Sequence, residues 1–188
     1  MVIGMRFFKN RGFAITITVV IAIVSMFLGV HRSLNKFSND IETMFYEGIY
    51  LEESKYTQPS IQSKLDQCAD QVLGIATIIT NNQQLKDNAD ELVLLRRELL
   101  SAESIKAKSA SFKNLTEAVD RTSKMLADTD LSEADINSVS DYLTRFHSAE
   151  EFIGNAAYNS AASERWNAQS NIARLFNLLI PAAKPEEF

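Results

Sequence analysis

The sequence contains few residues that form disulfides, bind metals or break helices. Cys68 is the only cysteine in 188 residues, which excludes an intrachain disulfide and a cysteine-ligated metal cluster. Inside a helical pattern, a lone thiol is typically a small buried apolar residue. Between Ser60 and Ile180 there is no proline, and Gly74 and Gly154 are the only glycines. Since a β-rich domain needs turn residues every few positions, this stretch predicts long helices.

Basic residues are too few for a nucleic-acid-binding surface. The 19 lysines and arginines stand against 24 acidic residues, for a net charge of −5. Three basic residues and no acidic ones precede residue 13, so the rest of the chain carries −8. This charge repels phosphate backbones, and no basic stripe with interleaved aromatic residues occurs. We therefore expect no nucleic-acid partner.

One uncharged run, Phe13 to Val30, is eighteen residues long. As a helix it would measure about 27 Å, close to the thickness of a bilayer's hydrocarbon core. Its two threonines and one serine can bond back to helix carbonyls. The alternative is a cleaved signal peptide, which usually has a shorter apolar core and small residues at −3 and −1. Cleavage after Gly29 would place Phe27 at −3, so we expect an uncleaved membrane anchor.

Basic residues flanking this run predict its direction. Arg6, Lys9 and Arg11 precede it, whereas Arg32 and Lys36 follow it. The flank of a membrane span that carries more lysine and arginine usually stays in the cytoplasm. The N-terminus is therefore expected in the cytoplasm. The prediction is a single-pass protein of the cell membrane with an extracytoplasmic domain.

Apolar residues at intervals of three and four predict four long helices after the anchor. The first continues the span to about Tyr56, with a seam of Leu34, Phe37, Ile41, Met44 or Phe45, Gly48 and Leu51. The others are expected near 59–81, 89–127 and 132–180, with Ser132 capping the last and Pro181 ending it. Their apolar seams are Ile61, Leu65, Cys68, Val72, Ile75 and Ile79 in the first of these, Leu92, Leu95, Leu99, Ala102, Phe112, Leu115, Val119, Thr122 and Leu126 in the second, and Ile136, Val139, Leu143, Phe146 and Ile153 in the first part of the third. Within the third, segment 101–111 is small and polar, and either packs tightly or breaks the helix. The predicted core includes Leu65, Val72, Leu99, Leu115, Val119, Leu143 and Phe146.

The predicted fold is all-α, with a transmembrane helix continuing into an antiparallel up-down four-helix bundle. The expected organisation is a basic N-terminus (1–12), an anchor (13–30), a bundle domain (31–180) and a polar tail (181–188). Up-down order would place the end of the last helix beside the start of the first. The pairs expected there are Ile172, Leu175, Phe176 and Leu179 with Leu34, Phe37 and Ile41.

Side chains capable of chemistry are sparse. His31 lies at the membrane boundary, and His147 with Glu151 at i, i+4 is better interpreted as a surface pair than as a weak metal site. There is no HExxH motif and no glycine-rich phosphate loop. We expect no catalytic residue, cofactor or metal site, and hence no enzyme.

Arg96 and Arg97 either bind an anionic partner or, as we favour, form ion pairs along their helix. The acidic residues within reach on that helix are Glu91, Glu98 and Glu103. Trp166 is either an anchor at the end of the bundle or an interface residue.

The layout resembles the LemA family, which has a short basic N-terminus, one span and a helical domain. Three patches carry the resemblance: Tyr158-Asn159, segment 171–176 (Asn-Ile-Ala-Arg-Leu-Phe), which looks like the family's Asn-Leu-Val-Ala-x-x-Phe, and segment 71–76 (Gln-Val-Leu-Gly-Ile-Ala). The family's Arg-Arg-x-Asp-Leu-Ile-Pro-Asn run is absent, and Trp166-Asn167 replaces a second Tyr-Asn. The resemblance implies a bacterial membrane protein with an antiparallel bundle and no established catalytic residues.

Two functions from different classes follow as expectations. The first is a non-catalytic interaction or scaffold module at the membrane, with a protein partner or a second copy of itself. The alternative is an extracytoplasmic sensory bundle that binds a small ligand and signals through a separate partner.

Overall fold

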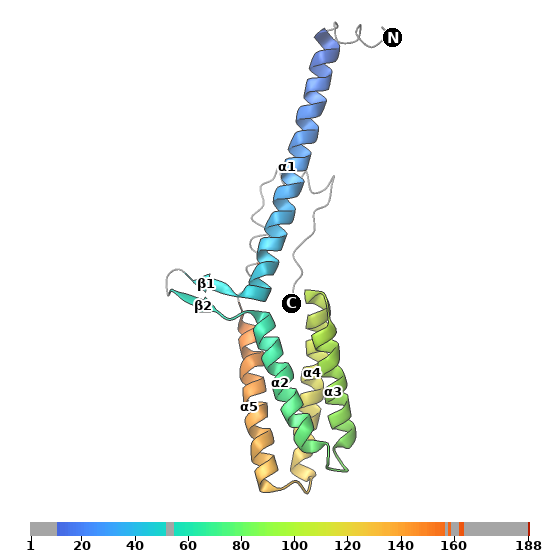
Figure 1. Cartoon of the computed structure of the whole chain (residues 1–188), viewed down its shortest axis with the longest axis vertical. Helices are drawn as coiled ribbons and strands as arrows, with labels where there is room; N and C mark the ends of the chain where they lie inside the picture. Colours follow the sequence, from blue (N-terminus) through green and yellow to red (C-terminus); the bar gives the residue numbers. More distant parts are fainter. Residues whose placement is uncertain (1–10, 52–54, 157, 159–161, 164–187) are drawn as a thin grey trace. The chain divides into compact units, whose positions relative to one another are not determined.

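The computed structural model describes residues 11–51, 55–156, 158, 162–163 and 188, and confirms a mainly helical chain (Figure 1). The helices are α1 (Arg11–Glu47), α2 (Ile61–Ile79), α3 (Lys86–Ser101), α4 (Ile105–Met125) and α5 (Glu133–Asn155). A 3₁₀ turn, η2 (Leu126–Asp128), follows α4, and strands β1 (Ile49–Leu51) and β2 (Tyr56–Gln58) form a hairpin. The described residues belong to two compact units, 11–40 and 41–163 with Phe188.

The first unit consists of most of α1, which is long and apolar enough to cross a membrane by length and composition. In the described part of the chain, no side chain between residues 12 and 33 is buried. The Oγ1 atoms of Thr16 and Thr18 each donate to the carbonyl oxygen four residues earlier, at 3.0 Å. As predicted, these hydroxyls are satisfied within their own helix.

Helix α1 ends at Glu47, so its predicted continuation to Tyr56 is wrong. Gly48 has φ +87°, where a side chain is strained, and a Cβ there would overlap the carbonyl oxygen of Gln58. Strand β1 then pairs antiparallel with β2, with Ile49 opposite Gln58. The β-branched and aromatic residues of both strands suit this pairing. Gly48 and Leu51 fit helical spacing by coincidence.

The predicted third helix is two helices. Ala102 has an extended backbone (ψ 124°), and the Ser104 side chain accepts a hydrogen bond from the Ala107 amide at 3.1 Å. Serine at this position caps the new helix and satisfies one of its free amides. Of the two alternatives for the small polar segment 101–111, the break is therefore the one found, and it lies at the start of that segment.

The predicted fourth helix begins as expected and ends early. Ser132 Oγ accepts a hydrogen bond from the Asp135 amide at 3.1 Å, which confirms the predicted cap. Helix α5 ends at Asn155, because Ala156 adopts an extended backbone with ψ 133°. A continuous helix to residue 180 is thus wrong. The predicted pairing of segment 172–179 lies outside the described residues.

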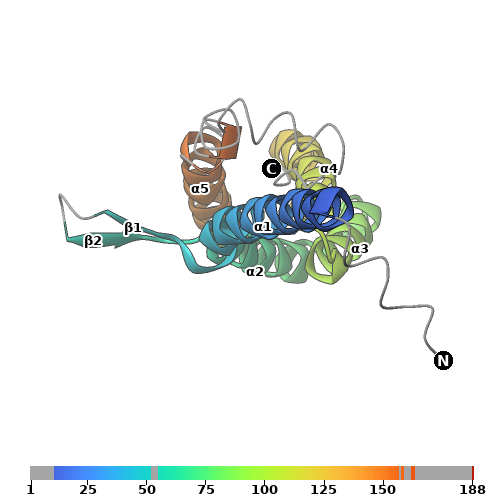
Figure 2. The ribbon, with the colours of Figure 1, turned by 90° about the horizontal axis from the view of Figure 1, so that it is seen from above.

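Within the second unit, α2 packs against both α3 and α5, and α3 packs against α4. Figure 2 shows α2 flanked by α5 and α3, with α4 next to α3. The predicted seam of α2 is confirmed, since all six of its residues are buried: Ile61, Leu65, Cys68, Val72, Ile75 and Ile79.

The rest of the predicted core is confirmed with one exception. Buried as expected are Leu99, Leu115, Val119 and Phe146, and Phe45 rather than Met44 is buried near the end of α1. Leu143 is only half-buried, and Ile136 at the start of its predicted seam is 40% exposed. Helix α5 therefore buries a shorter stripe than its sequence predicts.

Candidate functional site

His147 pairs on the surface with Glu150 rather than with the predicted Glu151. His147 Nδ1 lies 2.9 Å from Glu150 Oε2, one residue before the predicted Glu151. Both side chains are substantially solvent-accessible, as in an ordinary surface pair. Among the described residues, no group of three His, Cys, Asp or Glu side chains is placed to hold a metal ion.

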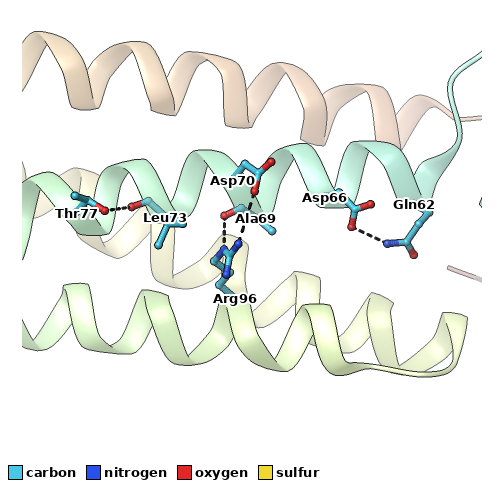
Figure 3. A network of polar contacts seen from close by, with 7 residues as sticks. All are labelled: Gln62, Asp66, Ala69, Asp70, Leu73, Thr77 and Arg96. Carbon is cyan, nitrogen blue, oxygen red and sulfur yellow. Dashed lines mark hydrogen bonds and ion pairs between the residues drawn. The ribbon is translucent and has the colours of Figure 1, made fainter.

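Arg96 joins two helices rather than pairing along its own. Its Nε donates to the Ala69 carbonyl oxygen of α2 at 2.9 Å, and its guanidinium lies 3.7 Å from Asp70 (Figure 3). The predicted neighbour Glu91 instead pairs with Arg121 of α4 at 2.6 Å. Because Asp70 is exposed, its ion pair contributes little, and the bond to Ala69 is the stronger link. The favoured prediction of pairing within the helix is therefore wrong for Arg96.

Cys68 is buried in α2, as predicted. Its Sγ lies 3.8 Å from the Phe146 carbonyl oxygen of α5. Burial raises the pKa of this thiol to about 12, with a further increase from Glu150 and an opposing decrease from Lys64. At neutral pH the thiol is protonated, so Cys68 is not a nucleophile.

Of the two other predicted positions, His31 alone is described. His31 Nε2 lies 3.1 Å from the Asn35 side-chain nitrogen one turn later in α1. Trp166 lies outside the described residues.

A polar hollow of about 720 Å³ lies between segments 77–84 and 130–135, where the turns after α2 and before α5 meet. Two pairs of its polar side chains bond one another. Asn82 Nδ2 donates to Asp130 Oδ1 at 3.0 Å, and Ser132 Oγ donates to Asp135 Oδ2 at 2.7 Å. The Asn82–Asp130 bond joins the two turns, whereas the Ser132–Asp135 bond lies within the start of α5.

The second hollow is a groove of about 450 Å³ between α4 and α5, here called the α4–α5 groove. Its lining includes Phe112 of α4, Ile153 of α5 and Phe188. The ring centroid of Phe188 lies 6.1 Å from that of Phe112 and 5.5 Å from that of Phe45. Aromatic pairs at such separations attract one another beyond simple burial.

Sequence reasoning missed this groove. The spacing predicts Phe112 and Phe146 as seam residues of two different helices, and their rings meet, at 6.2 Å. Phe45 and Phe188 join them from distant parts of the chain, and nothing in local periodicity predicts such a meeting. The apolar floor and the charged rim of Lys113, Glu117 and Glu150 suit binding of an aromatic or aliphatic group rather than catalysis.

Comparison with models of known protein families, with curated proteins and with solved structures found no match for this chain.

Proposed function

We propose that this chain is a membrane-anchored, non-catalytic protein that presents the helical unit after its anchor to another protein or to a second copy of itself. The observation that carries the proposal is the run 13–30. It is helical and uncharged, and none of its side chains is buried in the described structure. Leaving such a surface in water costs about 25 cal/mol per Å² of apolar area, and a bilayer removes that cost.

The proposed orientation places the N-terminus in the cytoplasm. Its support is the excess of Arg6, Lys9 and Arg11 over Arg32 and Lys36 at the two ends of the run. Protease added to intact spheroplasts is expected to digest the helical unit. Full protection until the cells are lysed would refute this orientation.

The proposed architecture of the second unit is an up-down four-helix bundle of α2, α3, α4 and α5. Its support is the packing of α2 with α3 and α5 and of α3 with α4, together with short connections between consecutive helices. We also propose that the chain is a divergent LemA-type bacterial protein. That proposal rests on the shared layout and the three sequence patches, and the comparisons add nothing to it.

The non-catalytic role is supported by how the candidate groups are used. The Cys68 thiol is protonated, the Arg96 guanidinium bonds a helix carbonyl, and His147 pairs with Glu150 on the surface. A catalytic site needs such groups to converge on one point.

Cross-linking in intact membranes followed by purification of the tagged full chain tests the proposal. A stoichiometric partner is expected, and a second copy is detected by co-expressing two differently tagged chains. The matched control is a Val20→Arg/Ile23→Arg variant, which lacks the uncharged run and should lose a membrane-bound partner. Recovery of neither a stoichiometric partner nor a second copy would contradict the proposal.

A sensory role is the second candidate, and the α4–α5 groove favours it. Its volume of about 450 Å³ lies within the roughly 300–1,000 Å³ of small-molecule sites. Ligand-dependent increases in melting temperature, together with absence of a stoichiometric partner, would support sensing over scaffolding.

A further inference from the structure

The hairpin of β1 and β2 packs little against the helices of the second unit. Each strand contacts the other, and no described helix contacts either strand to a comparable extent. Figure 1 and Figure 2 both show the hairpin projecting sideways from these helices. A two-stranded hairpin is marginally stable in water, whereas a third strand gives such a sheet independent stability. The hairpin is therefore a sheet that a third strand would complete.

The two outer edges of the hairpin differ in how well they are protected from pairing. No described segment forms backbone hydrogen bonds with either edge. Lys55 precedes β2 and Pro59, which has no amide hydrogen, follows it, and both residue types discourage pairing at an edge. In contrast, β1 contains only apolar and aromatic residues: Ile49, Tyr50 and Leu51. The edge open to another extended chain is thus that of β1.

The hairpin also presents two tyrosine side chains to solvent. Tyr50 is 60% exposed and Tyr56 is 54% exposed. In the antiparallel register Tyr50 pairs with Thr57, and Tyr56 pairs with Leu51. Because paired residues share a face and successive residues alternate, the two tyrosines lie on opposite faces of the hairpin. Neither forms a hydrogen bond or a ring contact in the described structure. Tyrosine is enriched among the residues that dominate protein interfaces.

The charge before β1 distinguishes between possible third strands. Glu47 is exposed, lies two residues before β1 and forms no ion pair within the described residues. A strand that pairs antiparallel with β1 brings its carboxyl-terminal end towards Glu47, because antiparallel neighbours run in opposite directions. A basic residue at that end is attracted there and an acidic one is repelled. In a second copy of this chain, the residues that follow β1 are Glu52 and Glu53, so the charge disfavours self-pairing.

We propose that the outer edge of β1 is a docking site for an extended segment of a partner protein, which adds as a third, antiparallel strand. Main-chain hydrogen bonds to the edge supply affinity, as in other cases of strand addition. An aromatic or β-branched residue of the segment packs beside Tyr50, and a lysine or arginine near its carboxyl-terminal end faces Glu47. This inference rests on the proposed function, for which it names the surface that meets a protein partner.

The test measures binding of a fluorescent peptide, Thr-Val-Thr-Tyr-Val-Lys-Lys, to the full chain in detergent micelles by fluorescence anisotropy. The peptide is expected to bind wild type saturably. It should bind Tyr50→Lys about tenfold or more weakly, because the ring is lost and lysine opposes pairing at an edge. A peptide with proline in place of both valines has the same charge and should not bind. The valines lie at positions of opposite parity, so at least one proline removes an N–H group that faces β1.

A charge swap locates the peptide on the edge of β1. Glu47→Lys should weaken binding of the peptide about fivefold, as expected for one exposed ion pair. A peptide ending in Glu-Glu instead of Lys-Lys should show the opposite preference and bind Glu47→Lys about fivefold more tightly than wild type. This gain cannot come from misfolding. The matched control is Asp141→Lys, which reverses an exposed acidic residue of α5 and should change neither affinity.

Folding of each variant is checked by helical circular dichroism. If Tyr50→Lys is misfolded, Tyr50→Thr replaces it and should weaken binding by a smaller factor, because threonine favours strands but lacks the ring. Absence of binding to wild type, equal binding by the Tyr50 variants, binding of the proline peptide, or no charge preference at Glu47 would each overturn the proposal.

Self-pairing is tested by oxidising Tyr50→Cys in a Cys68→Ala background. A disulfide-linked dimer whose formation the peptide prevents would place a second copy on the edge and overturn the assignment to a partner protein. Failure of the inference is distinguishable from failure of the proposed function, because the peptide assay uses no native partner. A stoichiometric partner from the cross-linking experiment together with no peptide binding would refute only the docking site.

Discussion

Gly74 of helix α2 lies against the ring of Tyr142 of helix α5. The effect of a methyl group at Gly74 on stability should therefore depend on whether that ring is present. A Cβ at Gly74 would lie 2.6 Å from Cε1 and Cζ of Tyr142 and 2.9 Å from its Cδ1. Such overpacking typically costs about 1–3 kcal/mol. Replacing a glycine by alanine inside a helix stabilises the helix by about 0.8–1.0 kcal/mol, because alanine has the higher helix propensity. Gly74→Ala should therefore destabilise the protein by roughly 0–2 kcal/mol.

Removing the ring should reverse this effect. In a Tyr142→Ala background, Gly74→Ala should stabilise by about 1 kcal/mol, because the helix-propensity gain remains and the clash is gone. The coupling between the two substitutions is then about 1–3 kcal/mol, or very roughly 2–12 °C in melting temperature for a chain of this size. The assay is thermal and urea unfolding of the four full-length variants in detergent, followed by circular dichroism.

Gly154→Ala is the matched control for this cycle. It lies in the last turn of α5, where a Cβ meets no described atom within 4 Å. It should be neutral to stabilising by up to about 1 kcal/mol in either background. If Gly74→Ala stabilises equally with and without Tyr142, the ring does not lie over Gly74 and the packing of α2 on α5 is not as described.

Three further predictions concern the core, the buried thiol and a helix cap. In urea unfolding, Leu65→Ala should lower the free energy of unfolding by about 2–5 kcal/mol, because Leu65 is fully buried. Leu143 is half-buried, so Leu143→Ala should lower it by roughly half as much, and equal losses would contradict the different burial of the two leucines. Because burial raises the Cys68 pKa above its unfolded value, its stability contribution is present below about pH 9 and lost towards pH 12. Between about pH 9 and pH 12, the free energy of unfolding of the wild type should thus fall by up to about 1.4 kcal/mol per pH unit relative to that of Cys68→Ala. Parallel pH profiles of the two proteins would refute the raised pKa of Cys68. Ser132→Ala should cost about 0.5–2 kcal/mol by removing the hydrogen bond to the Asp135 amide, and an unchanged melting temperature would show that the cap is dispensable.

The parts of the fold that the sequence predicts are those determined locally. The seam of α2 is predicted correctly because its six residues recur at intervals of three and four, which places them on one face of the helix. The start of α5 is predicted because a serine followed three residues later by an aspartate is a local capping signal.

The errors occur where a local pattern fits two structures. Gly48 and Leu51 continue the helical spacing of α1, yet the chain turns at Gly48 and forms a hairpin with residues that lie further along. Likewise, Ser104 is a plausible helix residue and a plausible cap, and packing of α3 against α4 decides between them.

The candidate site could not be predicted, because its parts are distant in sequence. Phe45, Phe112 and Phe188 meet only through the packing of the second unit. Arg96 shows the same limit: its charge suggests ion pairs along α3, but its geometry reaches the Ala69 carbonyl of α2. In both cases the chemistry is set by tertiary contacts that periodicity does not report.

Anchoring by residues 13–30 is tested most directly by alkaline carbonate extraction of membranes combined with the intact mass of the extracted protein. The wild-type chain is expected to stay in the membrane pellet with its N-terminal segment uncleaved. Val20→Arg/Ile23→Arg should move to the supernatant, since each arginine near the centre of a span costs about 2.5–3.5 kcal/mol. Release of the wild-type chain by carbonate, or a mass showing cleavage near Gly29, would contradict the central claim.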